Sequence, residues 1–125
     1  MGENELGERL LGCALRVHRA LGPGLLESAY EACLSHELSR AGLEHQRQLA
    51  MPVFYEGIRL DIGYRLDILV EQKVVVELKT VDILTDVHRA QLLSYLRLGG
   101  YRLGYLLNFN VRTLKTGICR LANAL

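Results

Sequence analysis

The sequence predicts a single α/β domain over residues 1–125, in the order ααββββαββ, with a mixed β-sheet flanked by helices. Apolar residues recur at helical spacing before residue 42 and after residue 85, and the stretch between them alternates with a period of two. A chain of 125 residues is long enough for one core and too short for two. The third helix separates two strands, which permits a crossover and therefore parallel pairing.

The first two helices are expected at residues 5–21 and 25–41. Gly22-Pro23-Gly24 ends the first helix, and Gly42 ends the second. His18 near the end of the first helix is interpreted as a capping or core histidine rather than a ligand. The expected inner faces are Leu6, Leu10, Cys13, Ala14, Val17 and Leu21 on the first helix, and Ala29, Cys33, Leu34 and Leu38 on the second.

Two strands, residues 43–55 and 58–62, are expected to form a hairpin with its turn at Glu56-Gly57. A third helix is expected to begin after a cap at Thr85 or Asp86 and to run to about Leu98. Its core face should hold Ala90, Leu92, Leu93 and Leu96, whereas His88, Gln91 and Tyr95 share another face. The last two strands are expected at residues 101–109 and 114–121.

Tyr64 to Thr80 predicts the central hairpin, and its hydrophobic pattern fixes the pairing. Side chains alternate between faces, so the apolar sets Leu66, Ile68, Val70 and Val74, Val76, Leu78 must share one face. A tight turn over residues 71–73 achieves this by pairing Val70 with Val74, Ile68 with Val76 and Leu66 with Leu78. The same register places Asp67 opposite Glu77, with Lys79 two residues further along that face.

Two opposed carboxylates repel each other unless a cation lies between them. Oxygen ligands on a rigid strand pair suit Mg²⁺, which polarises a phosphoryl oxygen and lowers the pKa of a bound water. A lysine near such a site can orient that water or stabilise negative charge. The alternative is a solvated sheet face on which Lys79 pairs with Glu77.

Two further polar residues are candidates for the same site. Glu27 lies in the first turn of the second helix, where the helix dipole favours a carboxylate, and its functional alternative is a further metal ligand. Gln91 would point at the site if the third helix packs beside the sheet, and its alternative is a solvent-exposed face.

Composition limits the classes of function. The net charge of +1 argues against a strongly basic nucleic-acid binder, although local patches matter more than the sum. The three cysteines have neither zinc nor disulfide spacing, which favours a reducing cytoplasm. No apolar run approaches a membrane span, and the acidic N-terminus is not a secretory signal. The high apolar content leaves room for a homo-oligomeric interface.

Several segments together resemble a known family. Residues 24–30, Gly-Leu-Leu-Glu-Ser-Ala-Tyr, match the signature of the GxxExxY proteins. The resemblance extends to residues 17–24, 64–67, 76–79, 90–96 and 107–111. This family is similar to the PD-(D/E)XK nuclease-like superfamily, whose restriction-endonuclease-like core is a mixed sheet flanked by helices.

The resemblance implies a site and an activity. Asp67 would be the motif aspartate, Glu77 and Lys79 the E-x-K pair, Glu27 the helix carboxylate and Gln91 the polar residue of the following helix. The Leu78 carbonyl would add a metal ligand, and Leu66 replaces the proline of the superfamily name. The implied function is a Mg²⁺- or Mn²⁺-dependent nuclease acting on DNA or RNA. The alternatives are a catalytically silent module that binds nucleic acid or a protein partner, and a dimer-forming domain with an ion-pair network.

Overall fold

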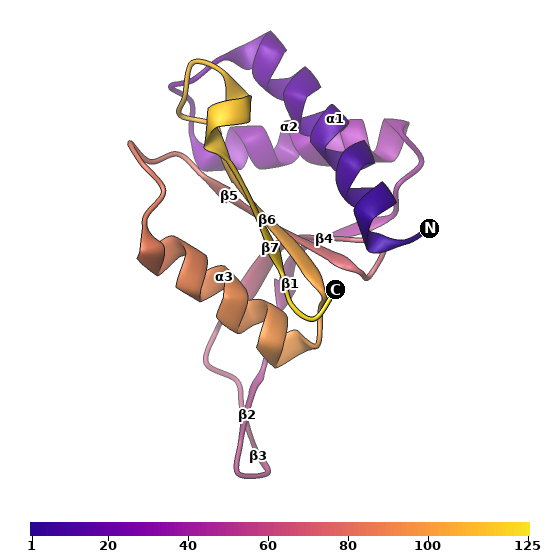
Figure 1. Cartoon of the computed structure of the whole chain (residues 1–125), viewed down its shortest axis with the longest axis vertical. Coiled ribbons are helices and arrows are strands. Elements are labelled where there is room, and N and C mark those ends of the chain that lie inside the picture. Colours follow the sequence, from indigo (N-terminus) through magenta and orange to yellow (C-terminus); the bar gives the residue numbers. More distant parts are fainter.

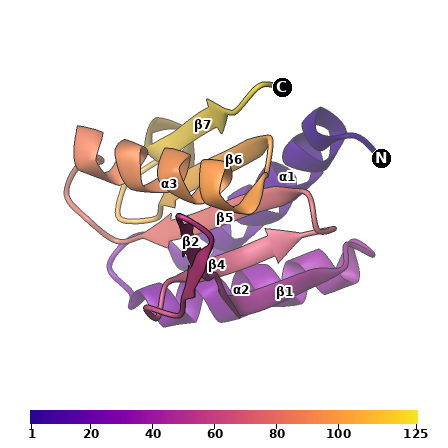
Figure 2. The same cartoon turned by 90° about the horizontal axis from the view of Figure 1, so that it is seen from below.

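The computed structural model describes residues 1–125 and consists of a five-stranded sheet with helices on both faces (Figures 1 and 2). This arrangement confirms the predicted α/β fold class. The elements are α1 (Glu3–Leu21), α2 (Glu27–Arg40), β1 (His45–Ala50), β2 (Val53–Tyr55), β3 (Ile58–Leu60), β4 (Arg65–Val70), β5 (Val74–Lys79), α3 (Asp86–Gly99), β6 (Leu103–Asn108), the 3₁₀ turn η1 (Leu114–Gly117) and β7 (Ile118–Ala122). No helix is both long enough and apolar enough to cross a membrane.

The sheet has the strand order β1-β4-β5-β6-β7. Strands β5 and β6 are parallel, and the other neighbours are antiparallel. Helix α3 connects the parallel pair, which confirms the predicted crossover. Strands β2 and β3 form a separate two-stranded hairpin, which projects from the main body at the bottom of Figure 1.

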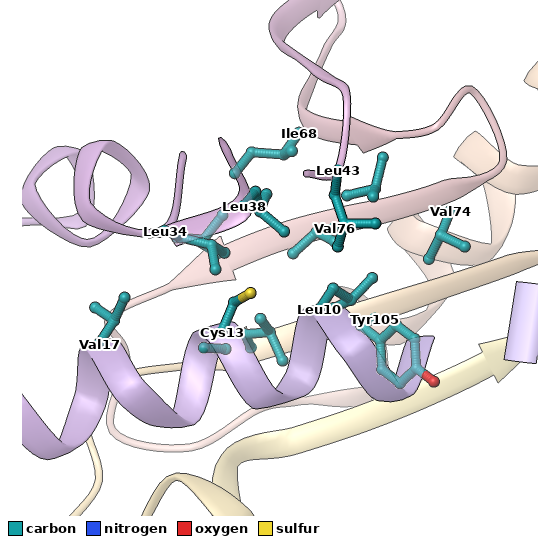
Figure 3. Close-up of a cluster of buried hydrophobic side chains, with 14 of the residues drawn as sticks. Leu10, Cys13, Val17, Leu34, Leu38, Leu43, Ile68, Val74, Val76 and Tyr105 are labelled. Atoms are coloured by element: carbon teal, nitrogen blue, oxygen red, sulfur yellow. The ribbon is translucent and has the colours of Figure 1, made fainter. Parts of the chain in front are cut away.

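Helices α1 and α2 cover one face of the sheet, where their apolar side chains meet those of β4, β5 and β6 (Figure 3). Val17, Leu34 and Val76 are among the buried residues of this cluster. His18 is buried as well, and its Nε2 lies 3.2 Å from the Phe109 carbonyl oxygen and 2.8 Å from that of Val111. Because both partners can only accept, Nε2 carries the proton, and the side chain ties α1 to the end of β6. His18 is therefore a core histidine, as expected.

Helix α3 covers the opposite face with Leu92, Tyr95 and Leu96. Thr85 caps the helix through a capping box with His88, in agreement with the predicted start. The prediction of Ala90 as a core residue is wrong because Ala90 is exposed, and Tyr95 contributes to the core instead. Leu21 on α1 is also exposed rather than buried, since it lies in the last turn beyond the sheet contact.

The expected strand at residues 43–55 is two strands. It breaks at Met51-Pro52, between β1 in the main sheet and β2 in the projecting hairpin. Proline has no backbone N–H to donate to a ladder, so pairing stops there. The turn at Glu56-Gly57 agrees with the prediction, because both residues have positive φ values of 48° and 79°. Residues 114–117 form η1, so the final strand starts later than expected.

The central hairpin has the predicted register, with Val70 opposite Val74 and Ile68 opposite Val76. The expected pair of Leu66 with Leu78 is absent, because the β4–β5 ladder ends at Ile68. Leu66 packs instead in the cluster under α3. Gln48 on β1 lies across from Asp67, has a φ of 51° and is missing from the β1–β4 pairs. The regular alternation of side chains between the two faces of the sheet is broken at this point.

Candidate active site

At Asp67 the ladder pairing of β4 is interrupted on both sides, toward β1 and toward β5. Hydrogen bonds made by the side chains of Asp67 and Glu77 take the place of the missing pairs on the β5 side. The Asp67 N–H donates to Glu77 Oε1 at 3.1 Å, and the Leu78 N–H donates to Asp67 Oδ2 at 2.9 Å. Each carboxylate thus accepts from the backbone of the other strand. This exchange holds the two carboxyl groups together between β4 and β5.

Glu77 is 5% exposed, and its pKa is raised from 4.5 to about 9, chiefly because burial penalises the charged form. The negative charge of Asp67 acts in the same direction, whereas Lys79 opposes it. The five ion pairs of the structure leave out Asp67, Glu77 and Lys79. The alternative in which Lys79 pairs with Glu77 is therefore not what the structure contains.

Lys79 ends β5 and is half-buried, two residues beyond Glu77. Its carbonyl oxygen accepts from the Phe109 N–H at 2.9 Å. The buried Asn108 side chain fixes the chain that follows, because its amide nitrogen donates to the Val81 carbonyl and its Oδ1 accepts from the Val81 N–H. The end of β6 therefore sets the position of Lys79.

Glu27 is the first residue of α2, and the residues around it define where that helix begins. Gly24 has a φ of 102°, a backbone conformation that favours glycine. The Tyr30 hydroxyl donates to the Gly22 carbonyl at 2.5 Å and accepts from the Leu25 N–H at 3.2 Å. The Tyr30 ring stacks on Phe109 with centroids 4.6 Å apart. The glycine and the tyrosine of the signature thus hold the turn that presents Glu27.

The electrostatics of Glu27 link it to the carboxylate pair. Partial loss of solvent raises its pKa, and the negative charge of Asp67 adds to that rise, whereas Lys79 opposes it. Glu27 itself is exposed, and no three His, Cys, Asp or Glu side chains are close enough together to hold a metal. Glu27 therefore lies near the pair without completing a three-carboxylate set.

Three residues that the sequence reasoning did not select also border the site. Gln48 Nε2 donates to Glu31 Oε1 at 2.7 Å and lies 3.4 Å from Asp67 Oδ1, and so it bridges α2 to β4. Glu31 is buried and pairs with Arg47 at 3.0 Å. Tyr95 is buried on α3, and its pKa is raised by burial and then by the charge of Glu77. Helical spacing was the available signal for two of them, since Glu31 follows Glu27 and Tyr95 follows Gln91 by four residues.

Gln91 is exposed on α3, one turn before Tyr95. Leu78 lies within β5, and its N–H reaches Asp67 as described above. The roles of the Gln91 side chain and of the Leu78 carbonyl stay predictions.

The two carboxyl groups offer oxygen atoms to a divalent cation. Asp67 Oδ2 and Glu77 Oε1 are engaged with backbone N–H groups. Glu77 Oε2 makes no hydrogen bond, and Asp67 Oδ1 has only the long contact to Gln48. Each carboxylate thus keeps one oxygen free of backbone hydrogen bonds, and burial and then the charge of Asp67 raise the pKa of Glu77. Carboxyl oxygens are the donors that a hard cation such as Mg²⁺ or Mn²⁺ prefers, so the two side chains fit such a cation.

A family model described as the PD-(D/E)XK nuclease superfamily matches residues 4–121. The chain therefore belongs to the PD-(D/E)XK nuclease superfamily, and its mixed sheet with three helices agrees with the core of that superfamily. Membership indicates nuclease-type function. Searches of curated proteins and of solved structures found no match. The narrower resemblance to the GxxExxY proteins stays a prediction.

Proposed function

We propose that this protein is a divalent-metal-dependent nuclease that hydrolyses phosphodiester bonds of DNA or RNA. The observation that carries the proposal is that Asp67 and Glu77 lie together at an opening in the sheet, where the carboxylate of each accepts a hydrogen bond from the backbone of the opposite strand. Superfamily membership supports the class of reaction, since nucleases of this superfamily generally use divalent metal ions.

Asp67 and Glu77 would hold Mg²⁺ or Mn²⁺, with the Leu78 carbonyl as a further ligand and Glu27 in support. The bound cation would polarise a phosphoryl oxygen and lower the pKa of a water molecule. Lys79 would position the attacking water from the end of β5 and stabilise the negative charge that develops on the phosphate. Gln91 would orient that water or the substrate. Hydrolysis would be direct, without a covalent intermediate on the protein.

The test is cleavage of a panel of DNA and RNA substrates with Mg²⁺ or Mn²⁺. Asp67→Ala and Lys79→Ala should each lower the cleavage rate by about a hundredfold or more, because each removes a group that stabilises the transition state. Lys73→Ala is a matched control, since Lys73 is an exposed lysine next to the opposite end of β5. Circular dichroism should show that all three variants keep the fold.

Two outcomes would contradict the proposal. Wild-type protein that binds nucleic acid but cleaves nothing with either metal would indicate a silent binding module. Equal loss of cleavage in Lys73→Ala and Lys79→Ala would show that the loss does not arise at this site.

A further inference from the structure

An aromatic pair lies beside the proposed metal site. Tyr64 directly precedes β4, three residues before Asp67, and its ring packs on that of Tyr95 with centroids 5.8 Å apart and planes tilted by 56°. Tyr95 in turn lies close to the two carboxyl groups, because the charges of Glu77 and Asp67 add to the rise in its pKa that burial causes. Tyr95 thus links the Tyr64 ring to the carboxylate pair.

The two rings differ in their exposure to solvent. Tyr95 is 7% exposed and belongs to the apolar cluster under α3, whereas Tyr64 is 42% exposed. The backbone of Tyr64 is fixed as well, since its carbonyl accepts from the Met51 N–H at 2.8 Å. An exposed ring is therefore held in place by a buried ring and by its own strand. Such a ring loses little conformational freedom when a flat partner packs on it.

The charges around the site are poorly suited to a duplex. Proteins that bind double-stranded nucleic acid gain most of their affinity by neutralising many phosphates. The whole chain has a net charge of +1. Near the site, the carboxyl groups of Glu27, Asp67 and Glu77 stand against the positive charges of Lys79 and Arg65. Contacts to the bases must therefore supply a large part of the affinity for nucleic acid, as they do in proteins that bind single strands by stacking.

We infer that Tyr64 stacks on an unpaired base of the strand whose phosphate lies at Asp67 and Glu77, so that the substrate class of this site is single-stranded DNA or RNA. The inference rests on the proposed function, which brings a phosphodiester to the two carboxylates. Three extended residues span at most about 10 Å, so the ring is within reach of a neighbouring nucleotide.

Stacking on Tyr64 selects against a duplex for a physical reason. Inside a duplex both faces of a base are covered by the neighbouring base pairs, and extruding one base costs about a few kcal/mol. An unpaired base offers its face without that cost. Every base has such a face, so the ring tolerates any sequence.

The test is fluorescence anisotropy with a labelled single strand and a labelled duplex of the same sequence. Ca²⁺ replaces Mg²⁺ as a hard cation with oxygen ligands, and gel electrophoresis checks that the strands stay intact. Wild type should bind the single strand about tenfold more tightly than the duplex or better. Tyr64→Leu should weaken binding of the single strand by about tenfold, because stacking on one base contributes about 1–3 kcal/mol. Duplex binding should not change.

Two further variants separate stacking from other effects. Tyr64→Phe keeps the ring and should bind the single strand within about twofold of wild type. Tyr55→Leu is the matched control, because Tyr55 is 64% exposed and ends β2 beside the turn of the projecting hairpin. It should bind both nucleic acids as wild type does. Circular dichroism should show the same fold for all variants.

The outcomes distinguish this inference from the proposed activity. Equal wild-type affinity for single strand and duplex would overturn the inference, as would equal losses in Tyr64→Phe and Tyr64→Leu or in Tyr55→Leu and Tyr64→Leu. If Mg²⁺ or Mn²⁺ then still supports cleavage, the proposed nuclease stands without it. A preference for single strands that depends on the Tyr64 ring, in a protein that cleaves nothing with either metal, would support the stacking and contradict the nuclease.

Discussion

The protonation state of Glu77 depends on its burial and on the carboxylate of Asp67 beside it. Its carboxyl group is buried, and the neighbouring Asp67 carboxylate repels the ionised form. A proton or a cation can relieve both effects, and these two alternatives exclude each other at the same oxygen atoms. The metal-free protein therefore keeps a proton on Glu77 over a pH range in which an ordinary glutamate is ionised.

Glu77→Gln should change the pH dependence of stability in the metal-free protein. The folded-state pKa of about 9 exceeds the ordinary 4.5, so between these values the folded chain holds a proton that the unfolded chain has released. The free energy of unfolding of wild type should therefore fall as pH rises through that window. Glutamine is neutral throughout, and the variant should become the more stable protein toward pH 9, by on the order of a few kcal/mol.

Urea unfolding followed by circular dichroism, with EDTA and at several pH values, measures this difference. Parallel pH curves for the two proteins would contradict the account. A variant less stable than wild type near neutral pH would instead support an ion-pair network at this position.

The start of α2 depends on contacts made by the turn before it. Tyr30 is fully buried, stacks on Phe109 and bonds through its hydroxyl to both sides of the turn at residues 22–25. The turn has no side-chain cap for the helix, because the N-cap residue is Leu26. Tyr30 thus holds the turn from within the core, and this contact fixes the position of Glu27 at the start of α2.

Tyr30→Phe removes the hydroxyl and leaves the ring stacking in place. The free energy of unfolding should fall by about 1–2 kcal/mol, since two hydrogen bonds are lost. The amide of Leu25 should also exchange with solvent faster, because its acceptor is gone. Chemical denaturation and hydrogen exchange measure the two effects.

Tyr105→Phe provides the comparison, since Tyr105 is also buried while its hydroxyl points away from the labelled cluster in Figure 3. Its stability should match wild type closely. Equal destabilisation by both substitutions would mean that the hydroxyl bonds of Tyr30 do not hold the turn.

The elements that were predicted correctly are those whose local pattern agrees with the tertiary contacts. Strict alternation and a three-residue turn predicted the β4–β5 register, because a slip would move Val74 and Val76 from the face under α1 and α2 to the face under α3. The break between β1 and β2 was missed, although Pro52 was the signal for it. The displacement of Leu66 had no such signal in its own strand, and it occurs beside the left-handed backbone of Gln48 on β1.

The parts of the site differ in the same way. The hydrophobic pattern of their own two strands predicted that Asp67 and Glu77 lie opposite each other. The β4–β5 ladder ends at Ile68, one residue before this pair, and the two side chains bond to the backbone of the opposite strand instead. Gln48 reaches Asp67 from the neighbouring strand β1, and Glu31 reaches Gln48 from α2, contacts between distant segments that no local pattern encodes. The helical spacing predicted that Tyr95 shares a polar face with Gln91. In the structure α3 is oriented so that Tyr95 is buried and Gln91 is exposed.

The molecule as a whole consists of one sheet between two apolar clusters, and the proposed site lies where that sheet is interrupted. Strand β5 stays paired to β6 along its full length, while β4 loses its ladder bonds at Asp67 on both sides. The large cluster beneath α1 and α2 holds the strands in place despite this opening. The packed sheet thus holds β4 and β5 in place at Asp67, where the carboxylates of Asp67 and Glu77 take over hydrogen bonds that the backbone would otherwise make.

A crystal soaked in Mn²⁺ and measured at a wavelength that gives anomalous scattering tests the metal site most directly. The account predicts an anomalous peak between Asp67 and Glu77, about 2.0–2.3 Å from one oxygen of each carboxylate, with Lys79 beside it. The same soak of Asp67→Ala crystals should lack that peak. A wild-type crystal with no density at this position under saturating Mn²⁺, or with Mn²⁺ held by other residues alone, would contradict the proposed metal-dependent nuclease.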